Sequence, residues 1–253
     1  MVVVDALSKR FGKLEVLKGV NATFAPGKVT AVIGPNASGK TTLMKSILGL
    51  VVPDTGTVTI DGEPARDNPA SRKAVGYMPQ EPRFPDNLKV SELFEFVQDL
   101  RGERPAGLDE LIDYFELRPH LTKPLRVLSG GTKQKTSAVL TFLFRPKVLI
   151  LDEPSAGLDP VASSRLKDRI LRERDLGATV ILTSHVMSEL EELTDEVLFL
   201  LEGTVRYAGT LDAIRAGTGE RRLERAIAKL MTGEVRLDDG FRLLMSEPRG
   251  EVA

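Results

Sequence analysis

Residues 34–41 read Gly34-Pro35-Asn36-Ala37-Ser38-Gly39-Lys40-Thr41 and fit the pattern G-x-x-x-x-G-K-[ST] without a gap. The segment follows an expected strand at Lys28–Ile33 and opens an expected helix over residues 39–48, which is the context that the pattern requires. Glycines let the backbone wrap a phosphate with its N–H groups pointing inward, and the helix start adds a partial positive charge. The stretch therefore predicts a nucleotide-binding loop, with Lys40 on the β- and γ-phosphates and Thr41 on Mg²⁺.

A second polar feature ends an apolar strand expected at residues 148–151, where Asp152 and Glu153 follow. A buried parallel strand delivers its last residues to the carboxyl edge of the sheet, where ligands of open α/β sheets bind. We therefore expect Asp152 to hold Mg²⁺, directly or through water. Glu153 points to the opposite side of the strand and is the candidate general base for an attacking water. The acidic start of an ordinary loop is the alternative interpretation.

The remaining pattern predicts an α/β fold. Strands are expected at residues 2–7, 15–24, 57–60, 75–79, 179–183, 196–201 and 204–208. Helices are expected at residues 90–100, 108–117, 129–144, 161–174, 186–193 and 220–231. Their alternation implies a mixed or parallel sheet core, preceded by an N-terminal antiparallel β-subdomain and interrupted by an inserted α-helical subdomain at about residues 86–146. The helix over residues 220–231 is amphipathic, with Leu223, Ile227, Leu230 and Met231 on one face, and we expect it to dock on the domain, with binding of a partner as the alternative.

The composition excludes several classes of protein. Of 253 residues, 42% are hydrophobic and 28% charged, which is typical of a globular protein, and the net charge is −1. Because a basic excess is missing, we expect no nucleic-acid partner. The chain has no cysteine, which excludes disulfides, thiolate zinc sites and cysteine nucleophiles. We read no signal peptide and no apolar run of about 20 residues, so we expect a cytoplasmic location, with any membrane link made through a partner.

A third motif, Leu128-Ser129-Gly130-Gly131-Thr132, precedes the helix expected at residues 129–144. Ser129 has the character of an N-cap, and the two glycines permit close approach of a ligand to the backbone. The motif is therefore a second anion-binding device, which most phosphate-loop enzymes lack. With it, the chain resembles the ATP-binding-cassette (ABC) ATPases, whose signature reads LSGGQ. The resemblance covers about residues 2–215 and rests on motifs that come in the family's order: Phe11, residues 34–42, Gln80, residues 128–132, residues 148–153, residues 155–159 and His185.

The resemblance implies a role for each matching residue. Phe11 would stack on the adenine, and residues from Gly34 to Thr42 would bind the phosphates. Gln80 would contact Mg²⁺ or the attacking water, and His185 would hydrogen-bond the γ-phosphate. The alternatives are a core Phe11, a solvated Gln80 and a structural His185.

The same resemblance implies a head-to-tail dimer with two ATP molecules between the subunits. Residues 128–132 would bind the γ-phosphate held by the second copy, and Asp159 would lie across the interface. Thr132 departs from the family, because Gln is usual there. Its hydroxyl should leave the phosphate contacts of Ser129 and the glycines intact, while the contacts of the usual Gln are in doubt.

The function expected from the resemblance is the ATP-hydrolysing subunit of a membrane transporter. Residues 1–217 would form the ABC ATPase, and residues 218–253 a short C-terminal extension with an amphipathic helix. The subunit would sit on the inner face of the membrane through a permease, with residues 80–86 helping to form the docking groove. The ending resembles subunits of exporter-type permeases, and residues 130–135 resemble ATPases of nitrous-oxide-reductase maturation, linked to copper or sulfur supply. A soluble cassette ATPase of DNA repair, chromosome maintenance or translation is the alternative, and a GTPase or small-molecule kinase is a weaker one.

Overall fold

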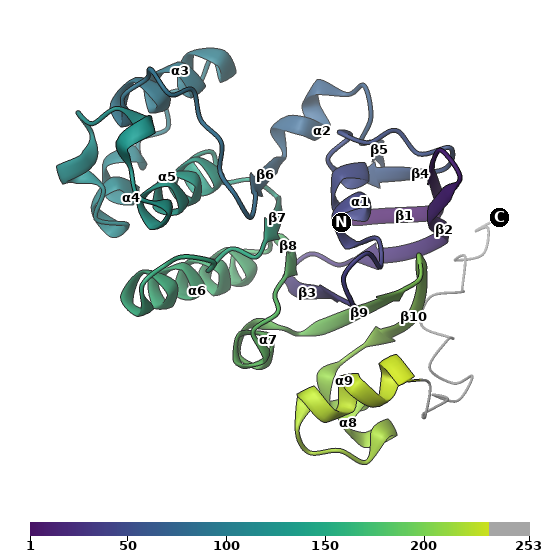
Figure 1. The fold of residues 1–253 in the computed structure, drawn as a ribbon. Coiled ribbons are helices and arrows are strands. Elements are labelled where there is room, and N and C mark those ends of the chain that lie inside the picture. The colour runs from purple at the N-terminus through teal and green to yellow at the C-terminus, as the bar shows by residue number, and fades with distance from the viewer. Residues whose placement is uncertain (233–253) are drawn as a thin grey trace.

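The computed structural model describes residues 1–232, which form two sheets (Figure 1). The N-terminal sheet is antiparallel and has the strand order β2-β1-β4-β5. The larger sheet has the order β10-β9-β3-β8-β7-β6, in which β10 is antiparallel to β9 and all other neighbours are parallel. The strands are β1 (Val2–Phe11), β2 (Leu14–Phe24), β3 (Lys28–Ile33), β4 (Thr55–Ile60), β5 (Glu63–Pro64), β6 (Val75–Met78), β7 (Val148–Asp152), β8 (Thr179–Thr183), β9 (Glu196–Leu201) and β10 (Thr204–Gly209).

The larger sheet divides the hydrophobic core into two parts, one on each of its faces, and helices pack against it. Side chains alternate along β3, so Ala31 packs with the helices on one face while Val32 packs toward the N-terminal sheet on the other. The first helix, α1, belongs to this second layer, since its Leu43 and Ile47 are buried among strands of both sheets. The helices are α1 (Lys40–Ile47), α2 (Pro69–Lys73), α3 (Val90–Arg101), α4 (Leu108–Tyr114), α5 (Gly130–Leu143), α6 (Pro160–Asp175), α7 (Met187–Leu193), α8 (Leu211–Thr218) and α9 (Leu223–Thr232), with the 3₁₀ turns η1 (Arg118–His120) and η2 (Leu125–Val127).

The predicted helical insert forms a block of its own beyond β6 and β7, built from α3, α4 and α5 (Figure 1). Buried aromatic rings hold it together: Phe115 stacks on Phe142 with 6.3 Å between the ring centroids, and both side chains are fully buried. The chain leaves the sheet at the end of β6 and re-enters it at the start of the adjacent strand β7, so the insert connects two neighbouring strands of the same sheet.

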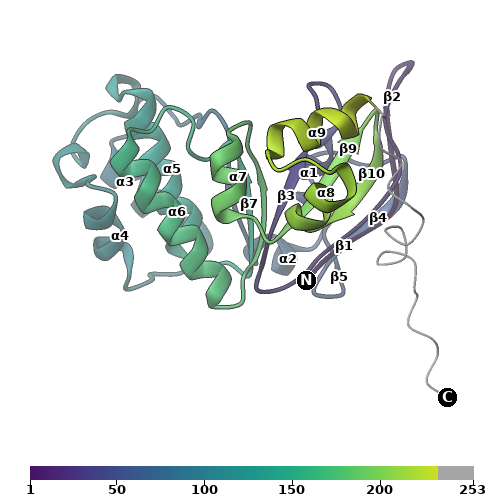
Figure 2. The same ribbon diagram turned by 90° about the horizontal axis from the view of Figure 1, so that it is seen from below.

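The helix predicted near the C-terminal end is docked on the domain. Leu223, Ile227 and Leu230 of α9 are buried in the same core as α7, and Figure 2 shows α8 and α9 beside α7. Met231 was assigned to the same apolar face but is 42% exposed. Of the predicted extension over residues 218–253, residues 233–253 lie outside the described part of the chain.

The predicted fold class is confirmed: the domain is α/β, with an antiparallel N-terminal sheet and a mixed sheet core. The bounds predicted for β3, β8 and β9 match the structure. The strand predicted at residues 2–7 is too short, because β1 continues to Phe11 and stays paired with β2 across several register shifts. Three short elements, β5, α2 and α8, were not predicted. Within residues 1–232, no helix combines the length and the apolar character that crossing a membrane requires.

Candidate active site

Four neighbouring parallel strands bring several of the predicted site residues to one edge of the larger sheet. Gly34 follows β3, Ser184 follows β8, Glu153 follows β7, and Gln80 lies two residues beyond β6. Because parallel strands end at the same edge, residues that are up to 150 positions apart in sequence converge there. The sequence shows only the order of these segments along the chain, and the fold brings them together.

The loop between β3 and α1 has room for glycine alone at two positions. Gly34 adopts a φ of +153°, and a Cβ there would lie 2.1 Å from the backbone oxygen of Leu200. Gly39 adopts a φ of +108°, and its Cβ would lie 2.9 Å from the oxygen of Val16 in β2. A side chain at either position would displace backbone, so the loop keeps its tight turn only with glycine. A tight turn that leads into a helix start is the arrangement that binds phosphate through backbone N–H groups in general.

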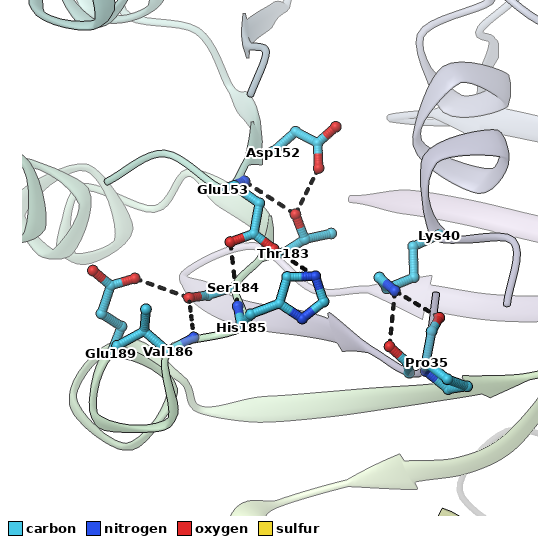
Figure 3. A network of polar contacts seen from close by, with 10 residues as sticks. Pro35, Lys40, Asp152, Glu153, Thr183, Ser184, His185, Val186 and Glu189 are labelled. Carbon is cyan, nitrogen blue, oxygen red and sulfur yellow. Dashed lines mark hydrogen bonds and ion pairs between the residues drawn. The ribbon is translucent and has the colours of Figure 1, made fainter. Parts of the chain in front are cut away.

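Lys40 already lies over this loop. Its Nζ donates hydrogen bonds to the backbone oxygens of Gly34, at 2.8 Å, and Pro35, at 2.9 Å (Figure 3). Burial lowers the pKa of the Lys40 ammonium, while the nearby carboxylates of Glu153 and Asp152 act to raise it. An ammonium that is partly desolvated and held by neutral carbonyls is well placed to gain from an incoming polyphosphate.

Asp152 is oriented by a threonine that the sequence patterns did not single out. Its Oδ1 accepts a hydrogen bond of 2.7 Å from the hydroxyl of Thr183, the last residue of β8. The same hydroxyl accepts the backbone N–H of Glu153 at 3.1 Å, so Thr183 ties both carboxylate positions to the neighbouring strand. The only hint in the sequence was the position of Thr183 at a predicted strand end.

The oxygen donors at this edge fit Mg²⁺. Asp152 offers a carboxylate, Thr41 an exposed hydroxyl and Gln80 an exposed side-chain amide. Within residues 1–232 no group of three His, Cys, Asp or Glu residues is arranged to hold a metal by itself. Mg²⁺ is usually bound by one or two carboxylates together with substrate phosphates and water.

Glu153 faces away from Asp152, as predicted (Figure 3). It leaves the strand with a φ of +48°, and its carboxylate accepts the backbone N–H of His185 at 3.2 Å. The other carboxylate oxygen lies 3.3 Å from His185 Nε2. Burial raises the pKa of Glu153, with Asp152 and Glu189 acting in the same direction and His185 opposing them. A carboxylate with a raised pKa suits a general base, whose pKa should approach the working pH.

The turn that carries His185 is braced by a buried pair. The hydroxyl of Ser184 donates to Glu189 Oε2 at 2.9 Å and accepts the backbone N–H of Val186 at 3.0 Å (Figure 3). Glu189 belongs to α7, so the start of that helix fixes the loop after β8. No sequence pattern marked this pair beyond its closeness to His185.

Phe11 is not a core residue. Its side chain is 50% exposed at the end of β1, and the Lys9 ammonium lies 5.2 Å from the ring centroid. The partner strand β2 packs on the phosphate loop, because the Val16 oxygen lies close to Gly39. The exposed ring is available for stacking on a base, and its exposure disagrees with the alternative of an ordinary buried phenylalanine.

The third motif forms the capped helix start that its residues predicted. The Ser129 hydroxyl accepts the N–H of Thr132 at 3.2 Å, and α5 begins at Gly130. Leu128 is buried and anchors the turn, while Gly130 faces open space, since a Cβ there would meet nothing within 4 Å. Gly131 packs tightly, because its Cβ would lie 2.8 Å from the Gly157 oxygen.

Asp159 is also a helix cap. Its Oδ1 accepts the N–H of Ala162 at 2.9 Å at the start of α6, and Oδ2 lies 3.5 Å from the Lys135 ammonium of α5. The hydrogen bond from Ala162 is the main cause that lowers the pKa of Asp159. A further link, from Gln134 Nε2 to the Pro154 oxygen at 3.1 Å, was not predicted. These contacts tie α5 to the segment that follows Glu153.

The fold and the site together define a phosphate-loop nucleotide-binding protein. Comparison with known proteins agrees, since the family model described as ABC transporter matches residues 17–156. The daunorubicin resistance ATP-binding protein DrrA3 of Streptomyces coeruleorubidus is 32% identical over 258 residues, which cover 96% of this chain and 82% of that protein. The lantibiotic transport ATP-binding protein SrtF of Streptococcus pyogenes is 33% identical over 207 residues, covering 81% and 89%.

Solved structures show the same relationship. An ATP-binding subunit of an ABC transporter superposes with a TM-score of 0.85 at 32% identity, covering 91% of this chain and 99% of that one. A dimeric bacterial ABC transporter cassette shares the fold, with a TM-score of 0.74 at 22% identity, covering 83% and 98%. This chain therefore belongs to the ABC transporter family. Within it, the chain is an ATP-binding subunit, an ABC ATPase.

Proposed function

We propose that this chain hydrolyses ATP between two head-to-tail copies of itself and thereby drives a separate membrane permease. The observation that carries the proposal is the separation of two anion-binding helix starts in one chain. The start of α1 follows the phosphate loop on one side of β7, and α5 lies on the other side (Figures 1 and 2). Ser129 is exposed at the start of α5, so a second copy can bring its own Ser129 to phosphates held by Lys40.

ATP is the substrate that the loop and the hairpin favour. The phosphates would lie on the N–H groups of the loop and on Lys40, and the adenine would stack on Phe11. In the second copy, Leu128 would support Ser129, Gly130, Gly131 and Thr132 against the γ-phosphate. The residues proposed for the first half-site are Phe11, Gly34, Pro35, Asn36, Ala37, Ser38, Gly39, Lys40, Thr41 and Thr42.

Mg²⁺ would be held by Thr41, Asp152 and Gln80. When bound, the ion would neutralise part of the negative charge of the phosphates. Thr183 keeps the Asp152 carboxylate turned to this position through its 2.7 Å hydrogen bond. This support is the counterpart of the outer hydrogen bonds that orient ligands at metal sites in general.

Hydrolysis would use Glu153 as the general base. The carboxylate takes a proton from water, whose oxygen bonds to the γ-phosphorus while the bond to the β–γ bridging oxygen breaks. The products are ADP and phosphate. His185 would hydrogen-bond the γ-phosphate. Its backbone N–H, 3.2 Å from the Glu153 carboxylate, and its Nε2, 3.3 Å from the other carboxylate oxygen, support a role for the two residues together. Lys40 stabilises the charge that develops in the transition state.

Charge explains why hydrolysis would open the dimer. The negative charges of ATP are neutralised by Lys40, Mg²⁺ and the helix starts of two subunits. Bound ATP therefore holds together two subunits that would dissociate without it. Splitting off the γ-phosphate breaks the link between the loop of one copy and Ser129 of the other. A permease that couples to this two-state change can alternate its access.

We propose the following domain limits and partners for the chain. Residues 1–217 would form the cassette, residues of about 86–146 its helical subdomain, and residues 218–253 the C-terminal extension. The segment over residues 80–86 would help to dock the permease, which would hold the subunit on the inner face of the cell membrane. We propose no nucleic-acid partner.

The relatives favour an exporter-type permease, because two of them carry names of drug resistance and lantibiotic transport. The finer proposal of a role in nitrous-oxide-reductase maturation, linked to copper or sulfur supply, rests on residues 130–135 alone. With no cysteine and two histidines, the chain itself offers few ligands for copper.

The dimer can be tested by measuring mass in solution. We expect the purified chain to be monomeric without nucleotide and to reach the mass of a dimer, by light scattering, when Mg²⁺ and a non-hydrolysable ATP analogue are added at high protein concentration. Omitting Mg²⁺ serves as the control and should favour the monomer, because phosphate charge then stays unneutralised. Monomers under all conditions, together with an unpaired subunit in the purified permease complex, would contradict the proposal.

A further inference from the structure

Two hydroxyl groups touch at the start of α5. The Ser129 Oγ lies 2.8 Å from the Thr132 Oγ1, and it also accepts the Thr132 backbone N–H at 3.2 Å. Either hydroxyl can donate in the first of these contacts. Thr132 is the residue that departs from the LSGGQ signature, so this chain has a hydroxyl pair where the signature places Gln beside Ser.

Counting donors and acceptors gives the pair a direction. A serine hydroxyl has one O–H donor and two lone pairs, and the Thr132 N–H occupies one lone pair of Ser129. If Thr132 Oγ1 donates to the other lone pair, the Ser129 O–H is left for an outside acceptor. A phosphate oxygen only accepts, so a bound phosphate selects this arrangement.

We propose that Thr132 is a positioning residue that turns the Ser129 O–H toward the γ-phosphate held by a second copy. This role rests on the proposed head-to-tail dimer, in which Thr132 would orient the contact between Ser129 and the γ-phosphate. The open space at Gly130, where a Cβ would meet nothing within 4 Å, leaves room for the anion beside Ser129.

The backbone around the pair is held in place by other contacts. Thr132 can therefore act on Ser129 by setting the rotation of the Ser129 hydroxyl. Gly131 packs on the Gly157 oxygen, and Gln134 donates to the Pro154 oxygen at 3.1 Å. Lys135 lies 3.5 Å from Asp159. These three contacts hold the first turn and a half of α5 against the segment that follows Glu153.

The test compares Thr132→Val, which removes the hydroxyl and keeps the shape, with Thr132→Ser, which restores a hydroxyl. For Thr132→Val we expect dimer formation, driven by Mg²⁺ and a non-hydrolysable ATP analogue, to weaken by about 3- to 10-fold, the scale of one hydrogen bond. Thr132→Ser should remain close to wild type. Thr136→Val is the matched control, because its hydroxyl donates to the Thr132 oxygen at 2.9 Å one turn further along the same helix and does not contact Ser129.

A second comparison separates positioning from simple helix capping. In a Ser129→Ala background, Thr132→Val should cause no additional loss, because the hydroxyl that Thr132 orients is gone. An additional loss of the same size there would overturn the inference. The inference would also be overturned if the wild type dimerises and the Thr132→Val chain dimerises equally well. In that case the proposed function would stand. If the wild type fails to dimerise, the proposed function fails, and this inference fails with it.

Discussion

Glu153→Gln will bind ATP normally but turn it over about 10² times more slowly or worse, the scale of a lost general base. Glutamine keeps the size of the side chain and an oxygen that can accept the His185 N–H, which glutamate now accepts at 3.2 Å. It cannot take a proton from water. Burial raises the pKa of Glu153, which brings the carboxylate closer to the range where a base is effective at neutral pH. Because hydrolysis opens the dimer, the variant should accumulate as an ATP-bound pair.

Single-turnover phosphate release measures the chemical step, and light scattering with Mg²⁺ and ATP measures the trapped pair. Glu110→Gln, an exposed acid on α4, provides a control that removes the same charge far from the sheet edge. It should match wild type in both measurements. Near-normal hydrolysis by Glu153→Gln would remove Glu153 from the role of base, whatever its contacts.

The second large effect is expected for Lys40→Ala, which should show no nucleotide binding at micromolar ATP. The substitution removes a charge-assisted contact to two phosphates, for which a loss of about 10²-fold in affinity is reasonable. Among the described residues 1–232, the Lys40 ammonium donates hydrogen bonds to the oxygens of Gly34 and Pro35, which belong to its own loop, so the loop should fold without it. Thermal unfolding should therefore change little.

Isothermal titration calorimetry of the variant with Mg²⁺ and ATP gives the affinity directly. Lys45→Ala is the matched control, because this lysine is exposed on the same helix, α1, and its loss should leave binding unchanged. Wild-type affinity in Lys40→Ala would contradict the assignment of residues 34–41 as the phosphate-binding loop.

Local signals in the sequence were enough to predict the parts of the site that depend on neighbouring residues. The glycine pattern of residues 34–41 located the turn between β3 and α1, because only glycine tolerates the backbone at Gly34 and Gly39. Ser129 was predicted as an N-cap and is one. The apolar run before Asp152 gave a buried strand whose end had to lie at the ligand edge.

Contacts between distant segments could not be predicted. Thr183 binds Asp152 across 31 positions, and no motif marked it as more than a strand end. The approach of Gly131 to the Gly157 oxygen and the exposure of Phe11 depend on how separate elements pack. Met231 shows the same limit, because helical spacing placed it on the buried face and the actual packing of α9 leaves it exposed.

The head-to-tail arrangement itself can be tested by crosslinking, since the chain has no cysteine to interfere. One variant carries Asn36→Cys at the exposed part of the phosphate loop, and another carries Gly130→Cys, where a side chain has open space. A short thiol crosslinker is added to each variant alone and to their mixture, with and without Mg²⁺ and a non-hydrolysable ATP analogue. The control is the wild-type chain, which offers no thiol.

We predict a crosslinked pair only in the mixture and only with nucleotide, because the loop of one copy then faces the capped helix of the other. Efficient crosslinking of Asn36→Cys to itself would instead show that two phosphate loops face each other. That result, or no nucleotide-dependent product in the mixture, would contradict the claim that one ATP is held by two copies from opposite sides.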